Sequence, residues 1–334
     1  MFQKQLHALI LLDLSAAFDT VDHTILLKRL RDIIGLQGNA LKWCQSYLQN
    51  RPQHVRIGNS TSDPVVHDFS VPQGSVLGPL WFTVYTYPVH SIILKHKLNY
   101  HVYADDTQLY FSFKPSKHFA DESISRIETC VGEIRVWMQD NFLKLNDNKT
   151  EFMILGSRQQ LSKVTIPQIN ISDSEVTAVT KARNLGVIFD SSMTLNSHIS
   201  SIARSTTFHI RNIGKVRKYL TQKATEQIVH SVVVSRLDMC NSLLYGLPNT
   251  QIERLQRIQN YAARVITLNK KSCHITPILK ELHWLPVLFV YKSLTNNAPA
   301  YIDDLLSSNN PPRKPRSYNS SLLIEPISNH SWGD

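Results

Sequence analysis

The stretch from Tyr100 to Phe111, YHVYADDTQLYF, constrains the fold of this chain more than any other. Two arms rich in aromatic and β-branched residues flank Ala104-Asp105-Asp106, which predicts a β-hairpin with both acids at its tip. Two adjacent carboxylates repel each other, so the tip is either a solvated acidic turn or a site for a divalent cation such as Mg²⁺, which prefers oxygen ligands. The apolar flanks favour a cation site, and a third carboxylate from elsewhere would strengthen that interpretation.

A third acid lies in the apolar run Leu9-Ile10-Leu11-Leu12-Asp13-Leu14. Such a run is typical of a central strand that is buried on both faces. Because a buried and unpaired carboxylate costs several kcal/mol, Asp13 is expected to be ion-paired, protonated or bound to a metal. The alternative is that Asp13 ends the strand and caps a helix that starts at Ser15.

Three motifs follow one another along the chain: DLSAAFD from Asp13, VPQGSVLGP from Val71 and YADD from Tyr103. In this order and rough spacing they resemble the palm of reverse transcriptases, most closely those of LINE-type (non-LTR) retrotransposons. The resemblance continues through WMQDNFLKLNDNKTEFMILG, NLGVIFD and SRLDMCNSLLYGLP, so it covers nearly the whole chain. It implies an α+β fold: a right-hand polymerase palm with a small antiparallel sheet and packed helices, followed by an all-helical thumb-like region.

The same resemblance implies an RNA-directed DNA polymerase, a nucleotidyltransferase that uses two Mg²⁺ ions, with Mn²⁺ as a substitute. Asp13 and Asp105 are the expected bridging ligands of the two ions, and Asp106 is the third, more peripheral carboxylate. The expected partners are an RNA template, a DNA primer and dNTPs.

Further site residues are carried over from the family. Phe18 is expected to exclude the 2′-hydroxyl of a ribonucleotide, unless it is an ordinary core residue. Gln73 and Gly74 are expected to contact the template and the incoming nucleotide, and Leu185-Gly186 resembles the turn that contacts the primer. Lys149 is the candidate that protonates pyrophosphate, with a surface lysine as the alternative.

The pattern of the chain predicts three parts: a partial fingers and palm domain over residues 1–190, a basic helical region over 197–308 and a loose tail over 309–334. The first part is expected to begin with a strand over 6–14 and to contain hairpins that pair 54–58 with 65–69 and 164–171 with 176–179. The hydrophobic periodicity predicts the helices 22–34, 41–48, 77–96 (kinked or split at Pro88), 121–142, 197–213, 221–237 and 250–267.

The formal charge of +10 is unevenly distributed. Residues 1–197 carry 19 Lys and Arg against 18 Asp and Glu, whereas residues 198–334 carry 17 against 8. A basic region of this kind is the expected footprint of phosphate binding, and the alternative is a basic helical domain that is merely soluble. The densest cluster, and the predicted nucleic-acid contact, consists of Arg204, Arg211, Lys215, Arg217 and Lys218.

The four cysteines are widely spaced and form no CxxC pair, which predicts free thiols in a reducing compartment. No apolar run reaches the roughly 18 residues of a membrane span. The expected location is therefore intracellular, in the nucleus or the cytoplasm, and the chain is not expected to be secreted.

The chain departs from the family pattern at two places. It begins twelve residues before Asp13, with the family's N-terminal fingers largely missing and no endonuclease before the palm, and Trp284–Val287 runs almost directly into Tyr291–Leu294. A second hypothesis from a different class is therefore a catalytically inactive, truncated remnant of an element that still binds nucleic acid.

Overall fold

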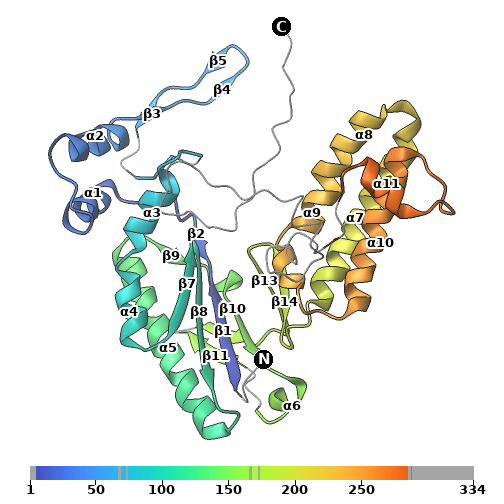
Figure 1. Cartoon of the computed structure of the whole chain (residues 1–334). Coiled ribbons are helices and arrows are strands. Elements are labelled where there is room, and N and C mark those ends of the chain that lie inside the picture. The colour runs from blue at the N-terminus through green and yellow to red at the C-terminus, as the bar shows by residue number, and fades with distance from the viewer. Residues whose placement is uncertain are drawn as a thin grey trace, which may run out of the picture. The chain divides into compact units, whose positions relative to one another are not determined.

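The structure is a computed structural model that describes residues 5–66, 69–72, 74–164, 168–171, 174–284 and 287 (Figure 1). The chain divides into two compact units: the sheet unit ends at Met193 and the helical unit begins at Thr194. The predicted tail at 309–334 and the predicted helical residues 288–308 lie outside the described residues. The mixture of helices and antiparallel strands confirms the α+β class, and the interpretation as palm and thumb stays a prediction.

The sheet unit is built on a four-stranded antiparallel sheet in the order β10-β1-β8-β7. The strands are β1 (Leu6–Leu12), β7 (Asn99–Tyr103), β8 (Asp106–Phe113) and β10 (Glu151–Leu155). Successive side chains of a strand point to opposite faces, and in β1 the even positions from Leu6 to Leu12 are at most 3% exposed. The odd positions are half-buried. The expectation of a strand fully buried on both faces is therefore wrong, because one face stays partly open.

Helices cover the buried face of this sheet. The apolar stripe of α5 (Lys117–Asp140) runs through Ile127, Val131, Ile134 and Met138, which are at most 2% exposed. The predicted break at Pro88 is confirmed, because the expected long helix is split there. The other helices of the unit are α1 (His23–Asp32), α2 (Gly38–Leu48), α3 (Gly78–Thr86), α4 (Val89–Lys95) and α6 (Arg158–Leu161). Figure 1 shows α4 and α5 along the same side of the sheet.

Small two-stranded pairs complete the sheet unit. They are β2 (Leu14–Ser15) with β9 (Lys144–Leu145), β3 (Pro52–Gln53) with β6 (Val65–Val66), β4 (Arg56–Ile57) with β5 (Ser60–Thr61), β11 (Gln168–Ile171) with β12 (Ser174–Thr177), and β13 (Lys181–Asn184) with β14 (Val187–Asp190). The predicted pairing of 54–58 with 65–69 is wrong. Gly58, with a φ of +60°, closes a tighter turn, so Arg56–Ile57 pairs with residues 60–61 instead.

The helical unit contains α7 (Asn196–Val216), α8 (Gln222–Val229), α9 (Ser235–Asp238), α10 (Asn249–Thr267) and α11 (Ile275–Glu281). Short 3₁₀ turns lie at Arg217–Tyr219 and Asn241–Leu244. The predicted helix 221–237 is interrupted by a π-helical turn at His230–Val234, which joins α8 to α9. A separate apolar core, with Ile210, Val233, Ala262 and Ile266 fully buried, holds these helices together. Within the described residues of both units, no helix is long and apolar enough to cross a membrane.

The four thiols differ in accessibility, which gives a direct test of the fold. Cys44 and Cys130 are buried, whereas Cys240 and Cys273 are exposed. Burial raises the pKa of the Cys130 thiol to about 12, and only the thiolate reacts with disulfide reagents. We expect two thiols of the native protein to react quickly with such a reagent and all four to react in denaturant. Fast reaction of Cys130 in the native protein would contradict the packing of α5.

Candidate active site at one end of the sheet

Three ionisable residues lie in one row at the end of the sheet: Lys149, Asp13 and Asp106. In the antiparallel pair of β1 and β8, Leu12 lies opposite Thr107, so continuing the register by one residue sets Asp13 opposite Asp106. On its other side Asp13 contacts Lys149, which lies in the 3₁₀ turn Asp147–Lys149 just before β10 and reaches Asp13 through its side chain. Directly opposed residues have Cβ atoms about 5 Å apart. Asp13 therefore lies between a basic and an acidic neighbour at the end of the sheet.

The turn between β7 and β8 supplies the second carboxylate of the hairpin tip. Tyr103 pairs with Asp106, so the turn consists of Ala104 and Asp105 alone. Ala104 has a φ of +54°, a left-handed conformation that costs a non-glycine residue roughly 1–2 kcal/mol. The tip predicted from the sequence is thus a tight, strained hairpin turn, and Asp105 is half-buried in it.

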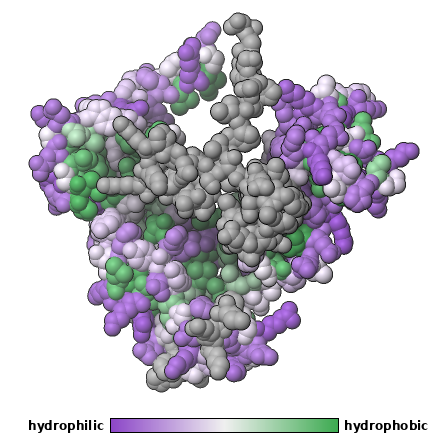
Figure 2. Space-filling model, viewed as in Figure 1, coloured by the Kyte–Doolittle hydropathy of each residue, from purple (hydrophilic) through white to green (hydrophobic). Residues whose placement is uncertain are grey.

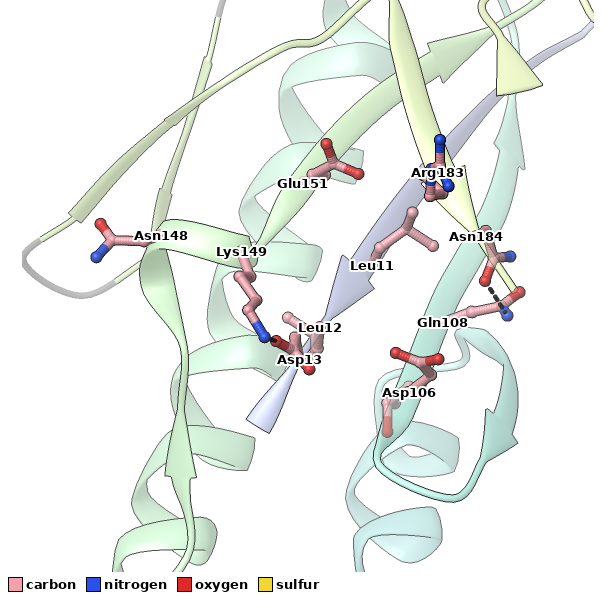
Figure 3. Close-up of a pocket in the computed structure, with 11 residues that line it drawn as sticks. Leu11, Leu12, Asp13, Asp106, Gln108, Asn148, Lys149, Glu151, Arg183 and Asn184 are labelled. Atoms are coloured by element: carbon pink, nitrogen blue, oxygen red, sulfur yellow. Dashed lines mark hydrogen bonds and ion pairs between the residues drawn. The ribbon is translucent and has the colours of Figure 1, made fainter. Parts of the chain in front are cut away.

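Asp13 is held by an ion pair with Lys149. Nζ of Lys149 lies 2.8 Å from Oδ2 of Asp13, and the Asp13 side chain is only 18% exposed (Figure 3). Oδ2 is buried, and among the described residues it has no partner with the full geometry of a hydrogen bond. The backbone is fixed separately, since the Asn146 N–H donates to the Asp13 carbonyl at 2.9 Å. The ammonium of Lys149 therefore stands next to this buried oxygen and balances its charge.

The pKa values of Asp106 and Lys149 are shifted by the charges that surround them. Burial raises the pKa of Asp106, and the charges of Asp105 and Asp13 raise it further, whereas Lys149 lowers it. The hydrogen bond and charge of Asp13 raise the pKa of Lys149. The ammonium of Lys149 thus stays protonated next to a group of mutually repelling carboxylates.

A cavity of about 410 Å³ opens over this row. It is lined from β1 by Leu11 and Asp13 and from β8 by Asp106 and Gln108, which share the open face of the sheet (Figure 3). Strand periodicity would have found Gln108, two residues after Asp106. The remaining polar residues of the lining could not be predicted, because nothing local signals them: Thr107, Asn148, Glu151, Arg183 and Asn184.

The hairpin of β13 and β14 joins the site through one contact. Nε2 of Gln108 donates to Oδ1 of Asn184 at 3.0 Å, which ties β13 to β8 beside the cavity (Figure 3). The following residues, Leu185 and Gly186, form the hairpin turn with φ values of +45° and +85°, as in a type I′ turn. The predicted primer-contact turn is therefore a tight turn that follows a residue lining the cavity.

The carboxylates of the site are the groups that would hold a divalent cation. Within the described part of the chain, no three His, Cys, Asp or Glu side chains gather closely enough to hold a metal ion. The raised pKa of Asp106, caused by burial and by the charges of Asp105 and Asp13, nevertheless fits a site where a bound cation would relieve the repulsion. Carboxylate oxygens are also the ligands that Mg²⁺ takes. The ammonium of Lys149 supplies the one neighbouring positive charge that the structure shows at Asp13.

Asp105 is not among the residues that line this cavity, and neither are Phe18 and Gly74. Phe18 packs against Phe82, with ring centroids 4.8 Å apart, and contacts the core of the sheet unit. Gly74 has a φ of +81°, which explains why glycine follows Pro72 and Gln73 in this turn. Gln73 itself lies outside the described residues. The nucleotide-binding roles of Phe18, Gln73 and Gly74 stay predictions.

The predicted basic cluster needs one correction. Arg204, Arg211, Lys215 and Lys218 are exposed on α7 and the turn after it. Arg217 is 8% exposed, and its guanidinium donates to the backbone carbonyls of Val265, Leu220 and Ile266 at 2.7–3.0 Å. All three donor nitrogens are therefore used inside the protein, and Arg217 is not available to a phosphate.

An antiparallel sheet with clustered carboxylates at one end, packed on helices, defines an α+β domain with an acidic site. The family model described as "Reverse transcriptase (RNA-dependent DNA polymerase)" matches residues 2–189. The chain therefore belongs to the reverse transcriptase family, and the family predicted from the three motifs is confirmed.

Curated relatives agree with this family. The chain is 27% identical over 269 residues to the "Probable RNA-directed DNA polymerase from transposon BS" of Drosophila melanogaster, a match that covers 77% of this chain and 28% of the relative. It is 25% identical to the "Probable RNA-directed DNA polymerase from transposon X-element" of the same species, over 91% of this chain and 34% of the relative. The chain thus spans about a third of the length of these relatives. These relatives support the predicted resemblance to LINE-type reverse transcriptases.

Solved structures show weaker likeness. The "Structure of apo telomerase from Candida Tropicalis" matches with a TM-score of 0.43 and 13% identity, over 83% of this chain and 45% of that one. A telomerase from Candida albicans in complex with a fragment of telomeric RNA gives a TM-score of 0.38 and 12% identity, over 83% and 49%. Because these TM-scores are low, the fold class rests on the helices and strands described above.

Proposed function

We propose that this chain is the catalytic segment of a LINE-type retrotransposon reverse transcriptase, which synthesises DNA on an RNA template from a DNA primer and dNTPs. The sheet unit would act as the palm of a right-hand polymerase and the helical unit as its thumb-like region. The observation that carries the proposal is the row of Lys149, Asp13 and Asp106 within a segment that matches the family model. The use of RNA and dNTPs implies an intracellular location.

Asp13, Asp105 and Asp106 are the residues that would hold divalent cations, which this family generally uses. When bound, two such ions would neutralise charge on the attacking 3′-oxygen and on the leaving pyrophosphate. The protein's part is to hold the carboxylates in place: Asp13 by the sheet register and the Asn146 N–H, Asp106 by its pairing with Tyr103. Lys149 stays protonated beside them and would offer a proton to the leaving group.

Primer extension tests the proposal. The full chain is incubated with poly(rA)/oligo(dT), dTTP and Mg²⁺, and incorporation is compared with that of Asp105→Ala/Asp106→Ala. We expect the double variant to lose about 10³-fold or more of the activity, the equivalent of roughly 4 kcal/mol of transition-state stabilisation. Asp121→Ala/Glu122→Ala is the matched control, since it removes an exposed acidic pair from α5 and should extend as the native chain does.

The same assay distinguishes an active polymerase from the second hypothesis, a catalytically inactive remnant that binds nucleic acid. Extension by the double variant at the native rate would remove these carboxylates from the mechanism. A native chain that binds the template–primer but extends nothing, with unchanged melting of all variants, would identify the inactive remnant instead.

A further inference from the structure

Helices α7 and α10 lie side by side in the helical unit and run in the same direction (Figure 1). Near their starts, Nη1 of Arg254 donates to Oγ of Ser200 at 3.0 Å. At their ends, Arg217 donates to the carbonyls of Val265 and Ile266. Between these contacts the pair leaves a surface hollow that follows both helices. At the helical rise per residue, the stretch from Ser200 to Gly214 is about 21 Å long.

Two adjoining hollows of about 680 and 740 Å³ make up this surface, which we term the α7–α10 groove. Arg257 lines both hollows, so the two meet at its side chain. The first is lined in addition by Arg204, Phe208, Arg211 and Arg254, and the second by Tyr261, Arg264, Leu268 and Lys271.

The charge of the groove is of one sign. The described helical residues 194–284 carry 13 Lys and Arg against 4 Asp and Glu, and none of the described residues lining either hollow is acidic. Among the described residues, neither Arg204 nor Arg211 has an ion-pair partner. Arg257 pairs with Glu253 at 3.3 Å, but both side chains are more than half exposed and such a pair is weak. The groove therefore attracts a polyanion.

Aromatic rings alternate with these cations. Phe208 is 61% exposed in the first hollow and Tyr261 is 42% exposed beside the second. A solvated basic surface does not need exposed aromatic rings, whereas unpaired bases stack on them and gain affinity by doing so. The visible face of the helical unit is mostly hydrophilic (Figure 2). The bases of a duplex are already stacked on each other and gain nothing from these rings.

Arg264 is held in place at the second hollow. Its Nη2 donates to the Cys273 carbonyl at 3.0 Å, which fixes the guanidinium among the lining residues. The fixed guanidinium places positive charge where a phosphate would be attracted.

We propose that the α7–α10 groove binds single-stranded nucleic acid, with phosphates at its arginines and bases on Phe208 and Tyr261. Positive charge alone does not distinguish a duplex from a single strand, and the exposed rings favour an unpaired strand. The proposal does not depend on catalysis, because binding is measured without nucleotides or metal and is thereby separated from the proposed polymerase activity.

Fluorescence anisotropy of the full chain with labelled oligo(dT) of about 12 nucleotides, a length within the range that single-strand sites cover, tests the proposal. Arg211→Ala/Arg257→Ala should weaken binding by about tenfold at low salt and reduce the slope of log K against log salt by about 1.4. Lys223→Ala/Lys280→Ala removes the same charge from exposed positions outside the groove and should change affinity by less than about twofold, since counterion release needs contact.

The aromatic variants distinguish a single strand from other polyanions. Phe208→Ala/Tyr261→Ala should weaken oligo(dT) binding by about tenfold and leave binding of a duplex of the same length unchanged. Tyr245→Ala, an exposed tyrosine outside the groove, is the matched control. Equal loss for duplex and single strand would overturn the proposal. So would displacement of oligo(dT) by poly-glutamate at the same charge concentration, because that result identifies an acidic protein as the ligand.

Discussion

Asp13→Asn is expected to reduce DNA synthesis on an RNA template by about 10³-fold while leaving the melting temperature nearly unchanged. Asparagine keeps the shape of the side chain but removes the charge from the residue at the centre of the row. The ion pair with Lys149 is lost as well, but Lys149 is 67% exposed, so its charge stays solvated. Initial rates of dTTP incorporation and thermal melting of both proteins give the comparison.

Glu151→Gln is the matched control for this variant. Glu151 lines the same cavity from β10 and stands opposite Leu11, so its substitution removes one negative charge from the same place. We expect it to change the rate by less than about tenfold, because long-range charge in a solvated cavity is worth little compared with a ligand. An Asp13→Asn variant that is no slower than Glu151→Gln would assign the chemistry to other residues.

Arg217→Met is expected to destabilise the helical unit by about 3 kcal/mol. Methionine preserves most of the aliphatic contact but leaves the carbonyls of Leu220, Val265 and Ile266 without their donors, at about 1 kcal/mol or more each. Two of these carbonyls belong to the last turn of α10, which also loses a favourable positive charge. Urea denaturation followed by far-UV circular dichroism measures the loss.

Lys215→Met controls for the removal of positive charge near the same helix end. Lys215 is exposed, so its substitution should alter the free energy of unfolding by no more than about 0.5 kcal/mol. If Arg217→Met behaves like Lys215→Met, then the buried guanidinium does not hold the end of α10, and Arg217 returns to the candidate phosphate contacts.

The carboxylates of the site could be predicted because their signals are local. Asp105 and Asp106 interrupt two β-prone arms, and Asp13 interrupts an apolar strand, so each position stands out from its immediate neighbours. The family motifs then placed the two segments in one site. The ion pair of Lys149 with Asp13 joins two segments that lie far apart in the sequence, so it could not be derived from either segment alone.

The errors arise where a distant contact decides the outcome. In the sequence, Arg217 cannot be told apart from the exposed basic residues near the end of α7. It is buried only because its guanidinium donates to a carbonyl at the end of α10. Arg183 and Asn184 reach the cavity through the placement of a separate hairpin. The π-helical turn at His230–Val234 left the hydrophobic periodicity almost unchanged, so one continuous helix was the natural expectation.

The alternation of the sheet has a consequence for how copies of such a sequence can change. Asp13 and Asp106 reach the cavity because both side chains point to the open face of the sheet. The side chains of their neighbours in sequence, Leu12 and Thr107, point to the other face and are buried. Gain or loss of a single codon within β1 or β8 would turn the following side chains to the other face, even though every other residue were kept. Gain or loss of two codons would preserve the face and shift only the position along the strand. Changes in length by an even number of residues should therefore be tolerated better in these two strands than changes by an odd number. A point substitution on the open face should be tolerated only if it preserves the chemistry of the site.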